Sequence, residues 1–353
     1  MKKNNLIFNM ATTALAIVIS MMIAFAIIFL VSEDPARAIE SFLLGPLQSK
    51  RLIGSIFTTA IPIAFTGIAV SIMFQASMFN MGAEGSFFLG ALAAAGAATS
   101  FNLPGILGII IPILVGGLTG AIICSIPAFL KIKWGANELV SSLMLNYVTF
   151  YLGLYILNNF IRDKNFGALA SHPLAQNNKL PRIVQGTSLH AGIYVVILLI
   201  VLSYLLIFKT SIGMKIRMLG QNPEFARYSG IKVGGVVIFS QLIGGMIAGI
   251  GGSVEIMGMY GRFQWTSLPG YGWDGIILAI LARNKPQFVP LAALFLSYLR
   301  VGASAMASNA EVPKELITVI QSIMIMLVTA NALLKSFKQK MVVKEALTNG
   351  TNS

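Results

Sequence analysis

Charged residues and cysteines are scarce in this 353-residue chain, and both shortages restrict what it can be. Charged residues make up 10% of the chain and hydrophobic residues 56%, and the mean hydropathy is +0.81. A typical soluble domain carries about 25% charged residues. The only cysteine, Cys124, lies in an apolar run, which excludes intrachain disulfides and cysteine-based metal clusters.

Motifs for catalysis and nucleotide binding are also missing. The two histidines, His172 and His190, do not have the spacing of a metal site and are expected in a loop or at an interface. There is no Gly-x-x-x-x-Gly-Lys-Ser/Thr phosphate loop and no Ser/His/Asp or Cys/His set. We therefore expect neither an enzyme nor a cofactor in this chain, and no Arg-rich voltage sensor or filter motif indicates a channel.

Long apolar runs are abundant, and residues 85–130 contain no charge at all. Because about 20 helical residues cross a bilayer, these runs predict an all-α polytopic membrane protein that forms one transmembrane domain over residues 1–353. The uncharged run 6–32 is too long for the apolar part of a signal peptide, so it is expected to stay as the first span. The ten expected spans are 8–31, 52–74, 84–100, 105–130, 139–160, 190–208, 233–252, 274–283, 287–303 and 315–334.

The net charge of +13 is read as a topology signal, and no nucleic-acid partner is expected. Lys and Arg accumulate on the cytoplasmic side of membrane proteins. The distribution of Lys and Arg along the chain predicts that both termini are cytoplasmic. It also predicts cytoplasmic segments at 209–232 and 335–353 and a long outer segment at 161–189. Small residues four apart predict close helix packing within the bundle: Gly116/Gly120, Gly244/Ala248/Gly252 and Gly245/Gly249.

The pattern Gly-x-acid-Gly occurs twice, as "GAEG" at 82–85 and "GWDG" at 272–275. Each copy follows an aromatic-polar stretch and opens a short apolar helix. The copies open the third and the eighth expected spans, and this odd offset predicts an inverted-topology repeat. Broken helices are expected around 74–85 and 262–283, where protein or water must shield the backbone.

Polar residues within the spans are candidates for the path of a solute. Glu84 and Asp274 either cap their own helices or take part in translocation. A polar face beginning at Asn137 suits either interhelical hydrogen bonds or an uncharged polar solute. The candidate path residues are Asn80, Glu84, Asn137, Ser141, Ser142, Asn146, Tyr271, Trp273 and Asp274.

The stretch "GMKIRMLGQNPEFARYSGIK" at 213–232 is a polar island between apolar spans. Gly220 is expected to end one turn, Asn222 to cap a new helix of about seven residues with Pro223 at its first position, and Gly230 to close it. Such a short helix is suited to docking by a soluble protein that drives transport. The residues expected to couple to it are Arg217, Gly220, Asn222, Pro223, Glu224, Phe225, Ala226, Arg227, Tyr228 and Gly230.

The island resembles the coupling segment of ATP-binding-cassette (ABC) importer permeases of the branched-chain amino acid, ribose and nucleoside group. "FNMGAEGSFFLGALAA", "ANELVSSLMLNYV" and "GYGWDGIILAILARNKP" are similar to signatures of the nucleoside branch, and the likeness covers about residues 50–335. It implies a plasma-membrane nucleoside permease paired with a second, related permease subunit. It also implies a cytoplasmic ATPase that hydrolyses the ATP and a lipid-anchored extracellular binding protein.

Other functions stay open at this point. The same scaffold serves sugars and branched-chain amino acids, so the substrate could belong to either class. A gradient-driven secondary transporter would instead use Glu84 and Asp274 as proton or ion sites.

Overall fold

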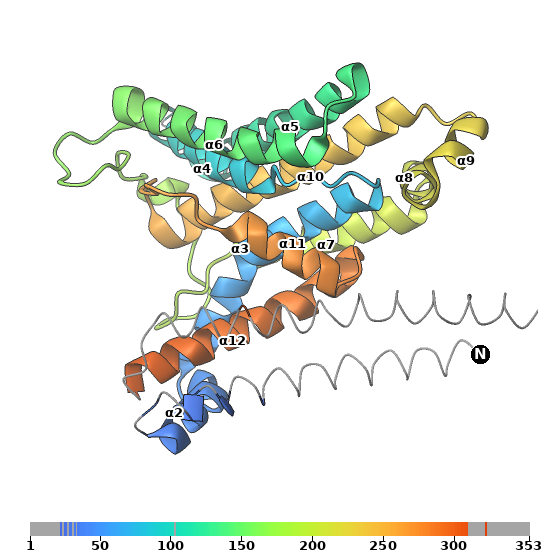
Figure 1. Ribbon diagram of the computed structural model, residues 1–353. Helices are drawn as coiled ribbons and strands as arrows, with labels where there is room; N and C mark the ends of the chain where they lie inside the picture. Colours follow the sequence, from blue (N-terminus) through green and yellow to red (C-terminus); the bar gives the residue numbers. More distant parts are fainter. Residues whose placement is uncertain are drawn as a thin grey trace, which may run out of the picture. The chain divides into compact units, whose positions relative to one another are not determined.

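The computed structural model describes residues 34–101 and 104–309, together with seven isolated positions outside these ranges (Figure 1). Over these residues the chain is helical, with only two isolated β-bridges and no sheet. The chain divides into two compact units, one formed by Lys50–Ser297 and the other by Met1–Ser49 with Tyr298–Ser353. The expected first and tenth spans, 8–31 and 315–334, fall almost wholly outside the described residues, as does the tail 335–353.

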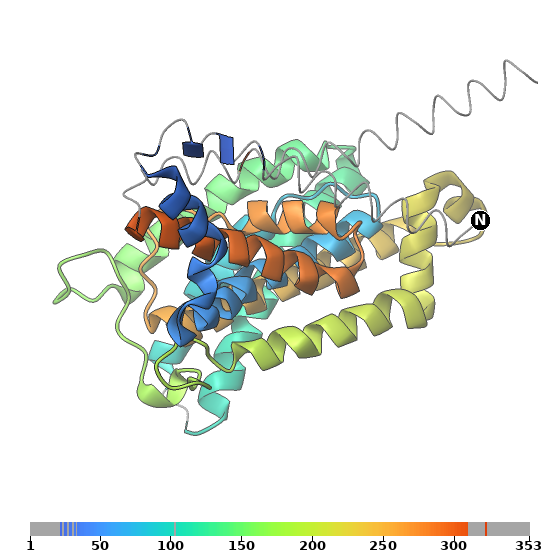
Figure 2. The ribbon, with the colours of Figure 1, turned by 90° about the horizontal axis from the view of Figure 1, so that it is seen from below.

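The larger unit contains the long helices. They are α3 (Lys50–Gln75), α4 (Ala83–Ser100), α5 (Leu107–Trp134), α6 (Glu138–Ile156), α7 (Gly192–Lys209), α8 (Ser211–Gln221), α9 (Pro223–Tyr228), α10 (Val233–Glu255), α11 (Tyr271–Leu281) and the start of α12 (Val289–Asn309). Short π-helical turns, Leu157–Ile161 and Ile256–Tyr260, extend α6 and α10. α8 and α9 lie at one end of this bundle and the segment that joins α6 to α7 lies at the other (Figures 1 and 2).

Six of the described helices are long and apolar enough to cross a membrane, and each coincides with an expected span. They are Lys50–Gln75, Leu107–Trp134, Glu138–Ile161, Gly192–Lys209, Val233–Tyr260 and Pro286–Asn309. α11 is apolar but has only 11 residues, as expected for a helix that does not cross alone. It begins at Tyr271, three residues earlier than expected, because Gly270 has a positive φ of 85° and interrupts the chain just before it.

The smaller unit holds a helix that hydropathy did not reveal, α2 (Pro35–Leu43). The Asp34 carboxylate accepts a hydrogen bond from the Arg37 N–H at 3.1 Å, and Pro35 occupies the first helical position. In the same unit the Tyr298 hydroxyl donates to the Leu43 carbonyl. These start signals were readable in the sequence, but nine residues are too few to stand out as a span.

Glycines set the distance between the central helices of the larger unit. α10 packs against α3, α4 and α5. A Cβ atom at Gly249 of α10 would lie 2.2 Å from the carbonyl oxygen of Gly116, and one at Gly120 of α5 would lie 2.3 Å from that of Gly245. The predicted close approach of helices at these small residues is therefore confirmed.

We expect Gly249→Ala to destabilise the protein by about 1–3 kcal/mol, because the added methyl group would overlap the α5 backbone. Gly235→Ala is the matched control, since a Cβ there meets nothing within 4 Å in the same helix. That change should be neutral or stabilising by up to about 1 kcal/mol. Thermal unfolding in detergent measures both, and equal shifts for the two variants would contradict the packing explanation.

Candidate functional site

The chain between α3 and α4 is the first of two breaks in the bundle, and Asn80 organises it. The Asn80 side chain is fully buried. Its oxygen accepts from the Gly82 N–H at 2.8 Å, and its amide donates to the Cys124 carbonyl at 2.9 Å and to the Gln241 side chain at 3.0 Å. The break is thus tied to α5 and α10 by hydrogen bonds that replace those lost at the helix end.

Two polar side chains of α6 complete the same break. The Ser142 hydroxyl accepts from the Met81 N–H at 3.0 Å. The Asn146 amide donates to the Met81 carbonyl, and its oxygen accepts from the Gly85 N–H, both at 3.0 Å. Ser142 and Asn146 therefore form interhelical hydrogen bonds, one of the two roles that the sequence left open.

The second break is the chain 261–270 that leads into α11, and the Glu84 side chain bonds to its end. Its carboxylate accepts from the Gly270 N–H at 2.6 Å and from the Gly272 N–H at 2.5 Å, and it is 1% exposed. Of the two roles that the sequence left open for Glu84, capping of its own helix is therefore excluded, because the carboxylate lies at the N-terminus of α11. The unpaired N–H groups and the positive end of the α11 dipole stabilise the buried negative charge there.

The two Gly-x-acid-Gly copies are in direct contact. A Cβ atom at Gly272 would lie 2.5 Å from the Glu84 backbone nitrogen, so only glycine permits this approach. At Gly275 an added Cβ would lie 2.6 Å from the Thr66 backbone, and the Thr66 hydroxyl donates to the Tyr271 carbonyl at 2.7 Å. The glycines of the second copy thus let α11 lie against both α3 and α4.

Sequence reasoning missed Glu255, which lies at the end of α10. This carboxylate is 3% exposed and accepts a hydrogen bond from the Tyr271 side chain. Its signal was an acid within an otherwise apolar, glycine-rich span, "GIGGSVEIM". The interior near the start of α11 therefore contains three acids, since Asp274 is also buried.

Two of the remaining path candidates, Asn137 and Ser141, lie elsewhere. Asn137 caps α6, and its side chain accepts from the Leu139 and Val140 N–H groups. Ser141 donates to a carbonyl of its own helix. The Trp273 side chain is half exposed, although its backbone N–H also hydrogen-bonds to Glu84 at the start of α11. The structure therefore brings together Asn80, Glu84, Ser142, Asn146, Tyr271 and Asp274, but not Asn137 or Ser141.

The polar island forms two helices, α8 and α9. The Asn222 side chain accepts from the Phe225 N–H at 3.0 Å, Pro223 follows it, and Gly230 closes the segment with a φ of 77°. The predicted cap, start and stop of this short helix are confirmed. Ala226 is fully buried, whereas Phe225 is 57% exposed and Tyr228 is 87% exposed.

Gly220 has a different role from the predicted one. It lies within α8, which continues to Gln221, and so does not end a turn. A Cβ atom there would lie 2.0 Å from the Gln75 carbonyl oxygen, and the Ser77 hydroxyl donates to the Gly220 carbonyl at 2.9 Å. Gly220 therefore packs the segment 213–232 against the end of α3. In the same segment, the Arg217 guanidinium lies 5.1 Å from the centre of the Phe208 ring of α7.

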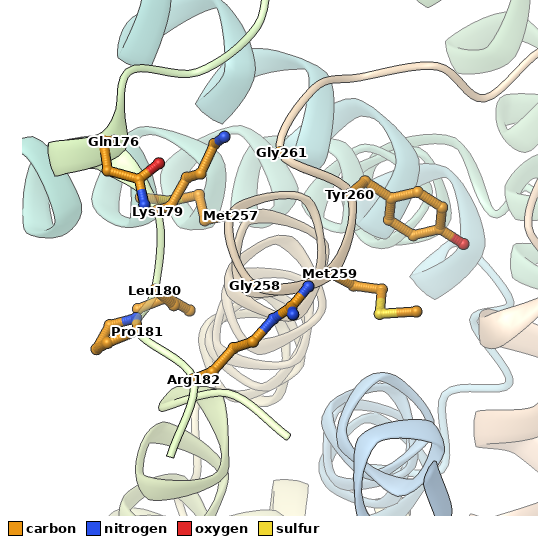
Figure 3. A pocket seen from close by; sticks show the side chains of 10 residues that line it. All are labelled: Gln176, Lys179, Leu180, Pro181, Arg182, Met257, Gly258, Met259, Tyr260 and Gly261. Atoms are coloured by element: carbon orange, nitrogen blue, oxygen red, sulfur yellow. The ribbon is translucent and has the colours of Figure 1, made fainter. Parts of the chain in front are cut away.

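A basic pocket lies at the opposite end of the bundle, between residues 176–182 and the turn 257–261 (Figure 3). Its volume is about 630 Å³, and Lys179 and Arg182 supply its positive charge. His190 packs against Gly258 beneath this turn and accepts from the Gly192 N–H at 3.2 Å. Burial lowers the pKa of His190 to about 4, so the imidazole is neutral near pH 7.

Comparison with known proteins identifies the family. Residues 52–329 match the family described as "Branched-chain amino acid transport system / permease component". The chain belongs to this family. Its several apolar helices are those of a multi-pass membrane protein, and no solved structure matches the chain.

Curated members of the family are similar along most of their length. The glucose ABC transporter permease protein TsgB13 of Haloferax volcanii is 31% identical over 93% of this chain and 89% of its own. The guanosine ABC transporter permease protein NupP of Bacillus subtilis is 28% identical, over 83% and 85%. The nucleoside ABC transporter permease protein NupB of Lactococcus lactis is 26% identical, over 94% of both. A second permease protein of each of the last two organisms, NupQ and NupC, also matches.

We expect Glu84→Gln to destabilise the protein by about 1–3 kcal/mol, because an amide can accept from only one of the two N–H groups and loses the charge. Glu40→Gln makes the same chemical change at an exposed position of α2 and should have little effect. Thermal unfolding in detergent distinguishes them. If Glu84→Gln unfolds at the wild-type temperature, its carboxylate does not hold α11.

Proposed function

We propose that this chain is a permease subunit of an ATP-driven nucleoside importer in the cell membrane. A second permease subunit of the same family would complete the translocation path. A cytoplasmic ABC ATPase would supply the energy, and a lipid-anchored extracellular protein would deliver the nucleoside. The support for a pair is that relatives in two organisms include two different permease proteins each.

The observation that carries the proposal is the geometry of α9. In α9 the side chain of Ala226 is buried, whereas the rings of Phe225 and Tyr228 are exposed. The helix lies at the opposite end of the bundle from the basic pocket (Figure 1). Exposed aromatic residues beside a buried anchor are typical of protein–protein contacts. In this proposal the ATPase binds α9, and the remaining residues of the segment 209–232 transmit the motion of the ATPase to α3 and α7.

The proposed topology has ten spans with both termini and α8–α9 in the cytoplasm. The two Gly-x-acid-Gly copies belong to an inverted repeat, whose halves meet at Glu84 and the start of α11. This arrangement is supported by the excess of Lys and Arg on the expected inner side. It is also supported by the contact between the two copies. Movement of one half against the other would then open the path to each side in turn.

Phe225→Ala should lower uptake about tenfold while the chain still assembles, because a contact of about 1.4 kcal/mol is lost at the ATPase. Val184→Ala truncates an exposed side chain at the other end of the bundle and should leave uptake unchanged. Uptake and ATP hydrolysis are measured in vesicles that contain the complete importer. Wild-type uptake by the Phe225 variant would refute the coupling role.

The substrate is tested by competition. Uptake of radiolabelled guanosine by cells that express the importer should be suppressed by unlabelled nucleosides and not by glucose or leucine. A sugar permease is the second candidate, because the glucose permease protein of Haloferax is 31% identical to this chain. Glucose uptake that nucleosides do not suppress would favour that candidate and contradict the nucleoside assignment.

A further inference from the structure

Three tyrosines form a stripe on the outward face of α6. Tyr147, Tyr151 and Tyr155 are 63%, 67% and 59% exposed. Since they are four residues apart, successive rings are offset by about 40° and all three lie within one narrow face. Among the described residues, none of the three hydroxyls makes a hydrogen bond. We refer to these three residues as the tyrosine stripe.

The stripe runs through the middle of a membrane span. α6 and its π-helical turn form the span Glu138–Ile161, which is about 36 Å long at 1.5 Å per residue. Tyr151 is then about 20 Å from its start, near the middle of a hydrocarbon layer about 30 Å thick. Tyrosines that anchor a protein at a membrane surface lie at the two interfaces, so this position needs another explanation.

Contact with lipid tails is unfavourable for the tyrosine stripe. A phenol hydroxyl without a hydrogen-bond partner is costly in hydrocarbon, and lipid tails offer none. A tyrosine near a span end can extend its hydroxyl to the interface, but Tyr151 is too far from either end to do so. The stripe therefore requires a polar neighbour in the assembled protein.

Two other spans, α5 and α7, show the composition of an outward face in this chain. The outward face of α5 carries Leu114, Leu118 and Ile122, which are all exposed. The outward face of α7 carries Ile197 and Val201 at the same spacing. Both faces are aliphatic in the middle of their spans, so the hydroxyls on α6 are a distinct feature of that helix.

The other side of α6 is already occupied. Ser142 and Asn146 bond to the break before α4, and Thr149 and Gly153 are buried against α4, where a Cβ at Gly153 would lie 2.6 Å from the Phe88 ring. The polar groups of that side have their partners within the chain. The unsatisfied polar groups of α6 therefore lie on its outward face, not on the face that the sequence favoured.

We propose that the tyrosine stripe lines the aqueous path of the assembled importer and contacts the solute there. Each tyrosine offers a flat ring and a hydroxyl at its edge. A planar base can stack on the ring, while its polar edge or a ribose hydroxyl hydrogen-bonds to the phenol. This inference rests on the proposed nucleoside function for the identity of the solute, but not for the presence of water along the stripe.

The test introduces one exposed cysteine into this chain, whose only native cysteine, Cys124, is fully buried and therefore contributes little background labelling. Tyr151→Cys is introduced into the importer in native membranes, which are then treated with a charged, water-soluble methanethiosulfonate reagent. Such a reagent reacts only with a hydrated thiolate, so it reports water at the residue. We expect Tyr151→Cys to be labelled, and guanosine to slow its labelling several-fold.

Leu118→Cys on α5 and Val201→Cys on α7 are the matched controls, because they lie at mid-span on the aliphatic outward faces. Both should remain unlabelled. Absence of labelling at Tyr151→Cys would overturn the proposal, since lipid or a partner subunit would then cover the stripe. Labelling that neither guanosine nor glucose slows would also overturn it. Protection by glucose alone would support the path and refute only the nucleoside assignment.

Kinetics of two further variants separate the ring from the hydroxyl. Tyr151→Phe removes one hydrogen bond and should raise the KM for guanosine uptake about threefold. Tyr151→Leu also removes the stacking surface and should raise the KM about tenfold or more. A purely structural role would instead lower the amount of assembled importer, so protein levels in the membrane are measured alongside. An unchanged KM in both variants would contradict solute contact.

Discussion

The contact between the Glu84 carboxylate and the start of α11 holds the two breaks of the bundle together. Inside a membrane no water is at hand to satisfy a broken helix end, so the chain itself must supply the partner. Here Glu84 accepts from two N–H groups at the start of α11, while Asn146 of α6 accepts from the Gly85 N–H at the start of α4. Each broken helix is thus capped by a different helix, and the breaks cannot be understood one at a time.

This mutual capping depends on how closely the helices approach. Gly272 allows the Glu84 backbone to come within reach of α11, and Gly116, Gly120 and Gly249 allow α5 and α10 to meet. An added Cβ atom at any of these contacts would lie less than 3.0 Å from an atom of a facing helix, so the helices would have to shift. The glycines therefore serve hydrogen bonding as well as packing, because the close approach of the helices brings donors and acceptors within bonding distance.

Hydropathy located all six long apolar helices of the described chain, because lipid demands a continuous apolar run from each of them. Local cap signals also predicted α9 correctly, since Asn222, Pro223 and Gly230 act on neighbouring backbone. The partner of Glu84 was not predicted, and the role of Gly220 was predicted wrongly. Both depend on residues more than 140 positions away, and no local pattern encodes which helix a side chain will meet.

α6 illustrates why periodicity alone leaves the role of a polar face open. A polar face inside a bundle has two possible uses, and a sequence shows the face but not whether its hydrogen bonds are already made. Once Ser142 and Asn146 are seen to bond to the break before α4, they are no longer available to a solute without cost. Tyr151 looked like an ordinary aromatic residue of a span, yet its exposed hydroxyl still has a hydrogen bond to offer. In a membrane protein, polar groups without a hydrogen-bond partner therefore indicate a solute contact better than polar groups that already bond within the fold.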